Sequence, residues 1–286
     1  MRKPDRCNRN APNIVKSGCL CYYTVMIGFF IKKAFYDGWD NLLSILVMNV
    51  AILAVAFGGW FLAGATLSFL PLSIFMLVLS AAAEGVLFLT ISALMAKVSK
   101  YESFSASDIG EAFGASWKHG ALFGLLIAAI VFVASVAFPY YFSLGNMIGL
   151  ALSIVIFWVT VVVALSLQWF LPIRSQLDTN FVKCLKKSFI IFFDNPGFSL
   201  FMFLYSLVLT VLSLVMVMLM PGFAGMILAH NNAFRLRMYK YDWLEEHPEL
   251  DVREARKSVP WAELLSEDED TVGHRTLKSF IFPWKD

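Results

Sequence analysis

Three long stretches of this chain are almost free of charged side chains. They cover residues 41–96, 119–173 and 195–234, and Glu84 is the only charged residue within them. A helix needs about 20 apolar residues to cross the hydrocarbon core of a bilayer, so each stretch is a candidate helical hairpin. The pattern predicts membrane-spanning helices at residues 41–65, 69–96, 120–137, 146–171 and 198–219.

The third stretch leaves open whether there are five or six crossings. Pro221-Gly222 interrupts it, and only residues 223–234 remain before the next basic residues, Arg235, Arg237 and Lys240. Basic residues beside spans favour the cytoplasm, and six crossings put every basic cluster there, whereas five put the last one outside. The sequence therefore predicts about six helices with both termini in the cytoplasm. The outer connections are then short and uncharged, at residues 66–68, 138–144 and 220–222.

Composition agrees with a membrane protein and excludes an ordinary soluble domain. Hydrophobic residues make up 59% of the chain and charged residues 15%, and the mean hydropathy is +0.69. Polar groups are too few to cover the surface of a soluble fold, so lipid must be part of the solvent. With basic inner loops, this indicates a multi-pass protein of a bacterial-type inner membrane.

The chain divides into three regions. Residues 1–28 form an N-terminal extension, of which residues 1–16 are basic and polar, and Met26 is a candidate native start because nothing before it joins the later pattern. Residues 29–240 form the polytopic membrane domain. Residues 241–286 form an acidic cytoplasmic tail, which we expect to be largely solvated.

The three stretches have similar entrances. Each is preceded by two aromatic residues four positions apart, which lie on one face of a helix: Phe35 and Trp39, Phe113 and Trp117, Phe189 and Phe193. The spacing from Phe35 to Phe113 is 78 residues and that from Lys97 to Arg174 is 77. We interpret this as three hairpin repeats, each opened by an amphipathic interfacial helix with an aromatic anchor. Chance similarity is the alternative, because any chain that enters a membrane tends to show such residues.

Glu84 is the first candidate for chemistry, because it is the only acid within a predicted span. A charge at that depth costs a few kcal/mol, so Glu84 should face the bundle interior or a wet cavity. It is either a proton or substrate site or a protonated, hydrogen-bonded structural residue. Four further polar side chains that can bridge membrane helices complete a candidate intramembrane site: Asn49, Gln168, His230 and Asn231. The segment His230-Asn231-Asn232 either lines a polar path with Glu84 or marks where the last helix leaves the membrane.

Motifs of other function classes are missing from the sequence. We find no phosphate-binding loop, metal-ligand cluster, nucleophile motif or nucleic-acid patch, so we expect neither an enzyme nor a bound cofactor or metal. The expected partners are the lipid bilayer and a membrane or cytoplasmic protein.

The opening pattern of Phe35, Trp39 and Asn41-Leu42-Leu43, followed by paired hydrophobic hairpins with basic inner loops, resembles the YesL-like family of bacterial membrane proteins. The resemblance covers residues 29–240. Members of that family often accompany carbohydrate-uptake genes, so it implies an accessory role in carbohydrate transport. The alternative is a membrane scaffold or regulator that binds cytoplasmic partners through its inner loops and tail.

Overall fold

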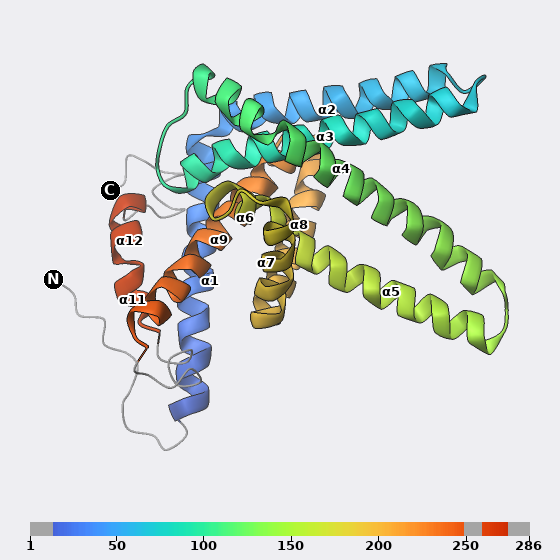
Figure 1. Cartoon of the computed structure of the whole chain (residues 1–286). Helices are drawn as coiled ribbons and strands as arrows, with labels where there is room; N and C mark the ends of the chain where they lie inside the picture. The colour runs from blue at the N-terminus through green and yellow to red at the C-terminus, as the bar shows by residue number, and fades with distance from the viewer. Residues whose placement is uncertain (1–13, 249–258, 274–286) are drawn as a thin grey trace. The chain divides into compact units, whose positions relative to one another are not determined.

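The computed structural model describes residues 14–248 and 259–273, and every regular element in this part of the chain is a helix (Figure 1). The predicted all-α fold is confirmed. Residues 1–13 of the expected N-terminal extension lie outside the described residues. The chain forms two compact units, one of residues 37–234 and one of residues 1–36 with 235–286. The helices are α1 (Ile14–Asp40), α2 (Leu42–Ala65), α3 (Leu70–Ser99), α4 (Ala106–Ser143), α5 (Met147–Leu167), α6 (Phe170–Gln176), α7 (Phe181–Asp194), α8 (Pro196–Val215), α9 (Gly222–Glu246), α11 (Trp261–Leu264) and α12 (Ser266–Val272).

Five segments of the described chain are long and apolar enough to cross a membrane. They are α2, α3, α4, α8 and the segment Met147–Gln176, which comprises α5 and α6. Their large apolar side chains are mostly exposed, as expected where lipid is the solvent. The chain is therefore a multi-pass α-helical membrane protein.

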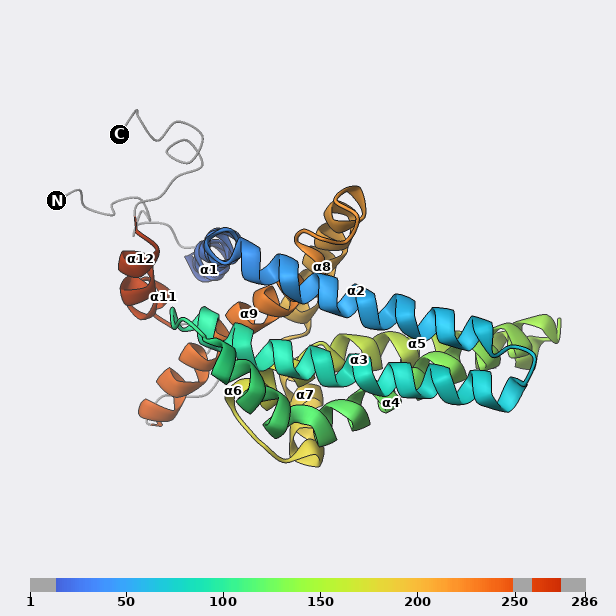
Figure 2. The same ribbon diagram turned by 90° about the horizontal axis from the view of Figure 1, so that it is seen from above.

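The first two hairpins form as the sequence predicts. In the first, α2 and α3 lie side by side in both views (Figures 1 and 2), and Ser73 Oγ of α3 donates to the carbonyl oxygen of Ala63 at 2.8 Å near the turn. In the second, Asn146 caps α5 by accepting from the backbone N–H of Gly149 at 2.7 Å. Figure 1 shows the α2–α3 and α4–α5 hairpins diverging toward their turns.

The segments that lead into the three apolar stretches differ in structure, whereas the predicted repeat treats them as alike. The chain breaks at Asn41 between α1 and α2, where Asn41 Nδ2 bonds back to the carbonyl oxygen of Asp37 at 3.0 Å. It breaks again at Asn195, which precedes Pro196, a residue without an N–H to continue the helix. At the corresponding place in the second stretch, His119-Gly120, the helix continues. The predicted span of residues 120–137 is therefore the middle of α4, a helix of 38 residues that includes the entry segment.

Glycine residues bring α3 and α4 into backbone contact where they cross. A Cβ atom on Gly85 would overlap the backbone of Gly120, and one on Gly124 would overlap the carbonyl oxygen of Ala81. Small residues at such spacing let two membrane helices approach closely. Near the crossing, α2, α3 and α9 share a buried apolar core that includes Ile52, Met95 and Leu228.

The third hairpin, formed by α8 and the first part of α9, is shorter than the others. The α8 helix has 20 residues, and Figure 2 shows it projecting to one side of the α2–α5 hairpins rather than running along them. Its turn into α9 packs on Asn49 of α2. Gly222, with φ +58°, is required there, because a Cβ atom would overlap the Asn49 side chain.

The second compact unit orders part of the acidic tail. Asp268 of α12 is buried, and it accepts from Arg235 Nη2 at 2.9 Å and from the Tyr239 hydroxyl at 3.1 Å. Lys32 Nζ donates to the carbonyl oxygen of Gly273 at 2.9 Å. Since Trp261 and Leu265 are also buried, residues 259–273 differ from the solvated segment that their charge suggested. A buried ion pair and two large apolar side chains hold them in place.

Candidate functional site: an apolar cavity between the helices

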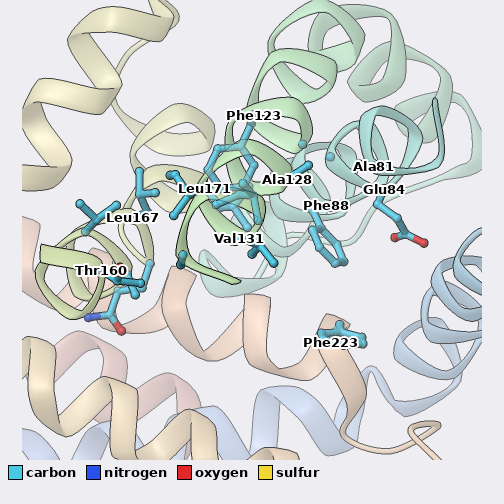
Figure 3. A pocket seen from close by; sticks show the side chains of 18 of the residues that line it. Ala81, Glu84, Phe88, Phe123, Ala128, Val131, Thr160, Leu167, Leu171 and Phe223 are labelled. Carbon is cyan, nitrogen blue, oxygen red and sulfur yellow. The ribbon is translucent and has the colours of Figure 1, made fainter. Parts of the chain in front are cut away.

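The 37–234 unit contains a cavity of about 930 Å³ between α3, α4, α5, α6 and the start of α9. α3, α4, α5 and α9 each contribute several lining residues, and α6 contributes Leu171. Figure 3 shows the labelled side chains of this wall, among them Phe88, Phe123, Val131, Leu167, Leu171 and Phe223. Almost the whole wall is apolar. The volume lies at the upper end of the roughly 300–1,000 Å³ that small-molecule sites occupy.

The cavity is long and open along one side. On α4 its lining runs from Phe123 to Phe138, which corresponds to about 22 Å of helix at 1.5 Å per residue. Val131, Phe138 and Phe157, which belong to the wall, are themselves exposed. The open side of the cavity is therefore bordered by exposed apolar side chains.

Two polar side chains meet at the end of the cavity where α5 ends. Gln168 Nε2 donates to the carbonyl oxygens of Leu165 at 2.8 Å and Ser199 at 2.9 Å. Its Oε1 atom lies 3.4 Å from His230 Nε2, and His230 Nδ1 lies 2.8 Å from the carbonyl oxygen of Met226. The structure therefore brings the predicted residues Gln168 and His230 together.

Glu84 also lines the cavity, from α3. Both carboxylate oxygens are shielded from solvent, and among the described residues neither has a hydrogen-bond partner. In Figure 3 the side chain lies at one end of the labelled wall, with its carboxylate pointing away from Phe123 and Leu171. Because an ionised carboxylate in an apolar setting is far costlier than a neutral one, Glu84 is expected to be protonated there.

Asn49 does not line the cavity. Its Nδ2 atom donates to the carbonyl oxygens of Leu219 at 3.0 Å and Pro221 at 2.9 Å, and its Oδ1 atom accepts from the N–H of Ala224 at 2.8 Å. All of its bonds go to the backbone of the α8–α9 turn. Asn49 is therefore a cap for that turn, where irregular backbone needs partners because lipid supplies none.

Asn231 belongs to a third group, which joins α3, α6 and α9. It accepts from Gln176 Nε2 at 2.8 Å and donates to Ser92 Oγ at 3.2 Å, and Ser175 Oγ bonds to Ser92 Oγ at 2.8 Å. Asn232 Nδ2 donates to Asp37 Oδ2 at 2.9 Å. The sequence did not single out Gln176, Ser92 or Ser175. In the sequence, each of these three residues shows only as a polar position near the end of an apolar run.

The predicted aromatic anchors lie mostly on the surface of the structure. Five of the six side chains are exposed, and Phe189 is half-buried. The exposed apolar side chains of α7, Val182, Ile190 and Phe193, lie on a helix that also carries Lys183 and Lys186, a composition typical of a helix at the membrane surface. Whether they contact lipid stays a prediction.

Charged groups gather where the helices connect, away from the cavity. Asp178 accepts from the backbone N–H of Asn180, and its Oδ2 atom lies 3.0 Å from Lys187 Nζ. Both contacts hold the pKa of Asp178 below its usual value. Arg174 donates to the carbonyl oxygen of Ala115 at 3.2 Å and lies 3.2 Å from His119 Nδ1.

Burial raises the pKa of the Cys184 thiol, which makes it a poor nucleophile. Within residues 14–248 and 259–273 no three His, Cys, Asp or Glu side chains are grouped to hold a metal ion.

No family model, curated protein or solved structure matches this chain. The resemblance to the YesL-like family therefore stays a prediction, and the function has to be argued from the cavity and its polar end.

Proposed function

We propose that this protein binds a long apolar, lipid-like molecule in the cavity between its membrane helices and acts in transport rather than in catalysis. The observation that carries the proposal is the cavity itself: its wall is apolar, it extends over about 22 Å of α4, and its open side is formed by exposed apolar residues. A molecule dissolved in the bilayer can enter it without crossing water.

The same wall argues against a sugar as the occupant. A carbohydrate needs a hydrogen-bond partner for most of its hydroxyl groups, and each polar group buried without one costs about 1–3 kcal/mol. The few polar side chains that line the cavity include Glu84, Thr160, Gln168 and His230. An accessory role beside a carbohydrate transporter would therefore act through a bound lipid or a protein contact.

Photolabelling tests the proposal. We would add a hexadecyl chain carrying a terminal diazirine to the full-length protein in nanodiscs, irradiate, and map the label by mass spectrometry. Ala128 of α4 lines the cavity, whereas its neighbour Ala129 is exposed and outside the wall. We expect label on the cavity faces of α4 and α5, its loss in Ala128→Phe, and its retention in Ala129→Phe. Label spread evenly over all lipid-exposed helices and unchanged in Ala128→Phe would refute the proposal.

We further propose a topology in which both termini lie in the cytoplasm of a bacterial-type inner membrane. Asn49, which caps the turn of the third hairpin, lies 16 residues before the end of α2 at Ala65, or about 24 Å along the helix. This supports a third hairpin that turns back within the membrane. With such a hairpin, Arg235 lies on the same side of the membrane as it would after six full crossings.

Cysteine accessibility in intact cells tests this topology. Single cysteines would replace Ser143, Thr179, Val217 and Ser266 in a background without Cys7, Cys19, Cys21 and Cys184. We expect an impermeant maleimide to label only the variant Ser143→Cys. Labelling of Val217→Cys as well would show that the third hairpin crosses completely, and labelling of Ser266→Cys would place the tail outside.

A second candidate function is a scaffold that binds a cytoplasmic protein through the tail. The observation that favours it is the folded α11–α12 segment, held by the Arg235–Asp268 ion pair at 2.9 Å. If this segment presents a binding surface, Asp268→Ala should lose the same partner in pull-downs as deletion of residues 259–286. Identical partner lists for wild type, point variant and deletion would exclude the scaffold function.

A further inference from the structure

The polar end of the cavity presents two hydrogen-bond acceptors to the same point. The orientation of the Gln168 amide is fixed, because its NH₂ group has two hydrogens and lies against two carbonyl oxygens, those of Leu165 and Ser199. The opposite orientation would set the amide oxygen against both carbonyls. Gln168 Oε1 therefore faces His230 Nε2 at 3.4 Å.

The tautomer of His230 follows from its other nitrogen. Nδ1 lies 2.8 Å from the carbonyl oxygen of Met226, which can only accept, so Nδ1 carries the hydrogen. In the neutral ring Nε2 then presents a lone pair to Gln168 Oε1. A charged ring would give Nε2 a hydrogen, but at the cost of burying an ion beside an apolar wall. A donor placed beside both atoms satisfies them without that cost.

We propose that this donor is the hydroxyl group of the bound lipid. The inference rests on the proposed function and specifies its ligand: a neutral lipid with a free hydroxyl at one end and a single long chain. The hydroxyl donates to His230 Nε2, beside Gln168 Oε1, and the chain lies along the α4 face from Phe123 toward Phe138. A pair of acceptors disfavours an anionic phosphate at the same point.

The chemistry predicts selectivity between ligands of equal length. A long-chain alcohol can donate to the acceptor pair, whereas its methyl ether cannot. Removing one neutral hydrogen bond of this kind typically costs about threefold to tenfold in affinity. The apolar contacts of the two chains are the same, so the difference isolates the polar end of the cavity.

Competition with the diazirine probe measures this selectivity on the full-length protein in nanodiscs. We expect hexadecanol to displace the probe at a concentration about threefold to tenfold lower than hexadecyl methyl ether. The difference should vanish in His230→Phe. Thr160→Val is the matched control, because Thr160 also lines the cavity but its hydroxyl bonds to the carbonyl oxygen of Ile156 in its own helix at 2.8 Å. It should keep the preference.

The outcomes separate the two proposals. Equal displacement by alcohol and ether in the wild type overturns the hydroxyl site and leaves the lipid-binding function in place. Displacement by neither compound overturns the function itself. A preference that His230→Phe retains would assign the hydroxyl to another group, and the wild-type comparison remains decisive even if that variant does not fold.

Discussion

The substitution Gly120→Ala should destabilise the membrane domain, although alanine is the better helix former. A Cβ atom on Gly120 would lie 2.6 Å from Val86 Cα, 2.8 Å from the carbonyl oxygen of Gly85 and 3.0 Å from the N atom of Val86. All three atoms belong to the backbone of α3. No side-chain rotation can move them away, so the two helices must separate.

The size of the effect follows from these distances. Ordinary contact with a Cβ atom begins at 3.4 Å, so α3 and α4 must move apart by roughly 0.8 Å at Gly120. The close contacts of Gly85 and Gly124 with the opposite helix would loosen at the same time. Overpacking of this kind costs about 1–3 kcal/mol. The intrinsic preference of a helix for alanine over glycine returns about 0.5–1 kcal/mol, so the net loss should be about 0–2.5 kcal/mol.

Unfolding of the purified protein by sodium dodecyl sulfate in mixed micelles, followed by tryptophan fluorescence, measures this loss. Gly114→Ala on the same helix is the control, because a Cβ atom there meets nothing within 4 Å. We expect that variant to be more stable than the wild type by up to about 1 kcal/mol. If Gly120→Ala were as stable as Gly114→Ala, the backbone contact between α3 and α4 would be refuted.

Three further predictions follow from single side chains. Asn49→Leu leaves three backbone groups of the α8–α9 turn unpaired and should cost about 3 kcal/mol or more in the same unfolding assay; a loss below about 1 kcal/mol would contradict the capping role. The folded-state pKa of Asp178 is lowered, so its stabilisation is present above the ordinary carboxyl pKa and is lost as pH falls through the folded value. The stability advantage of the wild type over Asp178→Asn should therefore shrink below about pH 4, and a constant difference down to pH 2 would refute this linkage. Glu84→Gln, which keeps a neutral side chain, should insert normally and alter transport or its pH dependence; unchanged uptake would count against a transport role for Glu84.

The sequence predicted those parts of the fold that depend on local composition. Runs without charge mark the helices of the first two hairpins, because every charge placed in the hydrocarbon core costs several kcal/mol. The end of α1 at Asp40 and the start of α8 at Pro196 also have local causes. The continuity of α4 through His119-Gly120 was missed, because glycine and histidine weaken a helix without ending it.

The candidate site was predicted only in part, because contacts between distant segments leave no local signal. Gln168 and His230 are 62 positions apart and Asn49 and Pro221 are 172 apart. A polar residue in an apolar run shows that some partner is needed, but not which one. Of the five candidate residues, Asn49 caps a turn and Asn231 joins three helices, whereas Glu84, Gln168 and His230 line the cavity.

The cavity and the glycine crossing have a common geometric origin. The α3 residues that line the cavity lie between Ala81 and Phe88, the segment that contacts Gly120 and Gly124, whereas the α4 lining continues to Phe138. Beyond the crossing α4 leaves α3 and runs beside α5 (Figure 1). The cavity therefore opens where α3 and α4 separate beyond their close approach at the glycine crossing. A change that separates α3 from α4 at Gly120 must therefore also reshape the cavity wall, so the proposed lipid binding should depend on the same contact as stability.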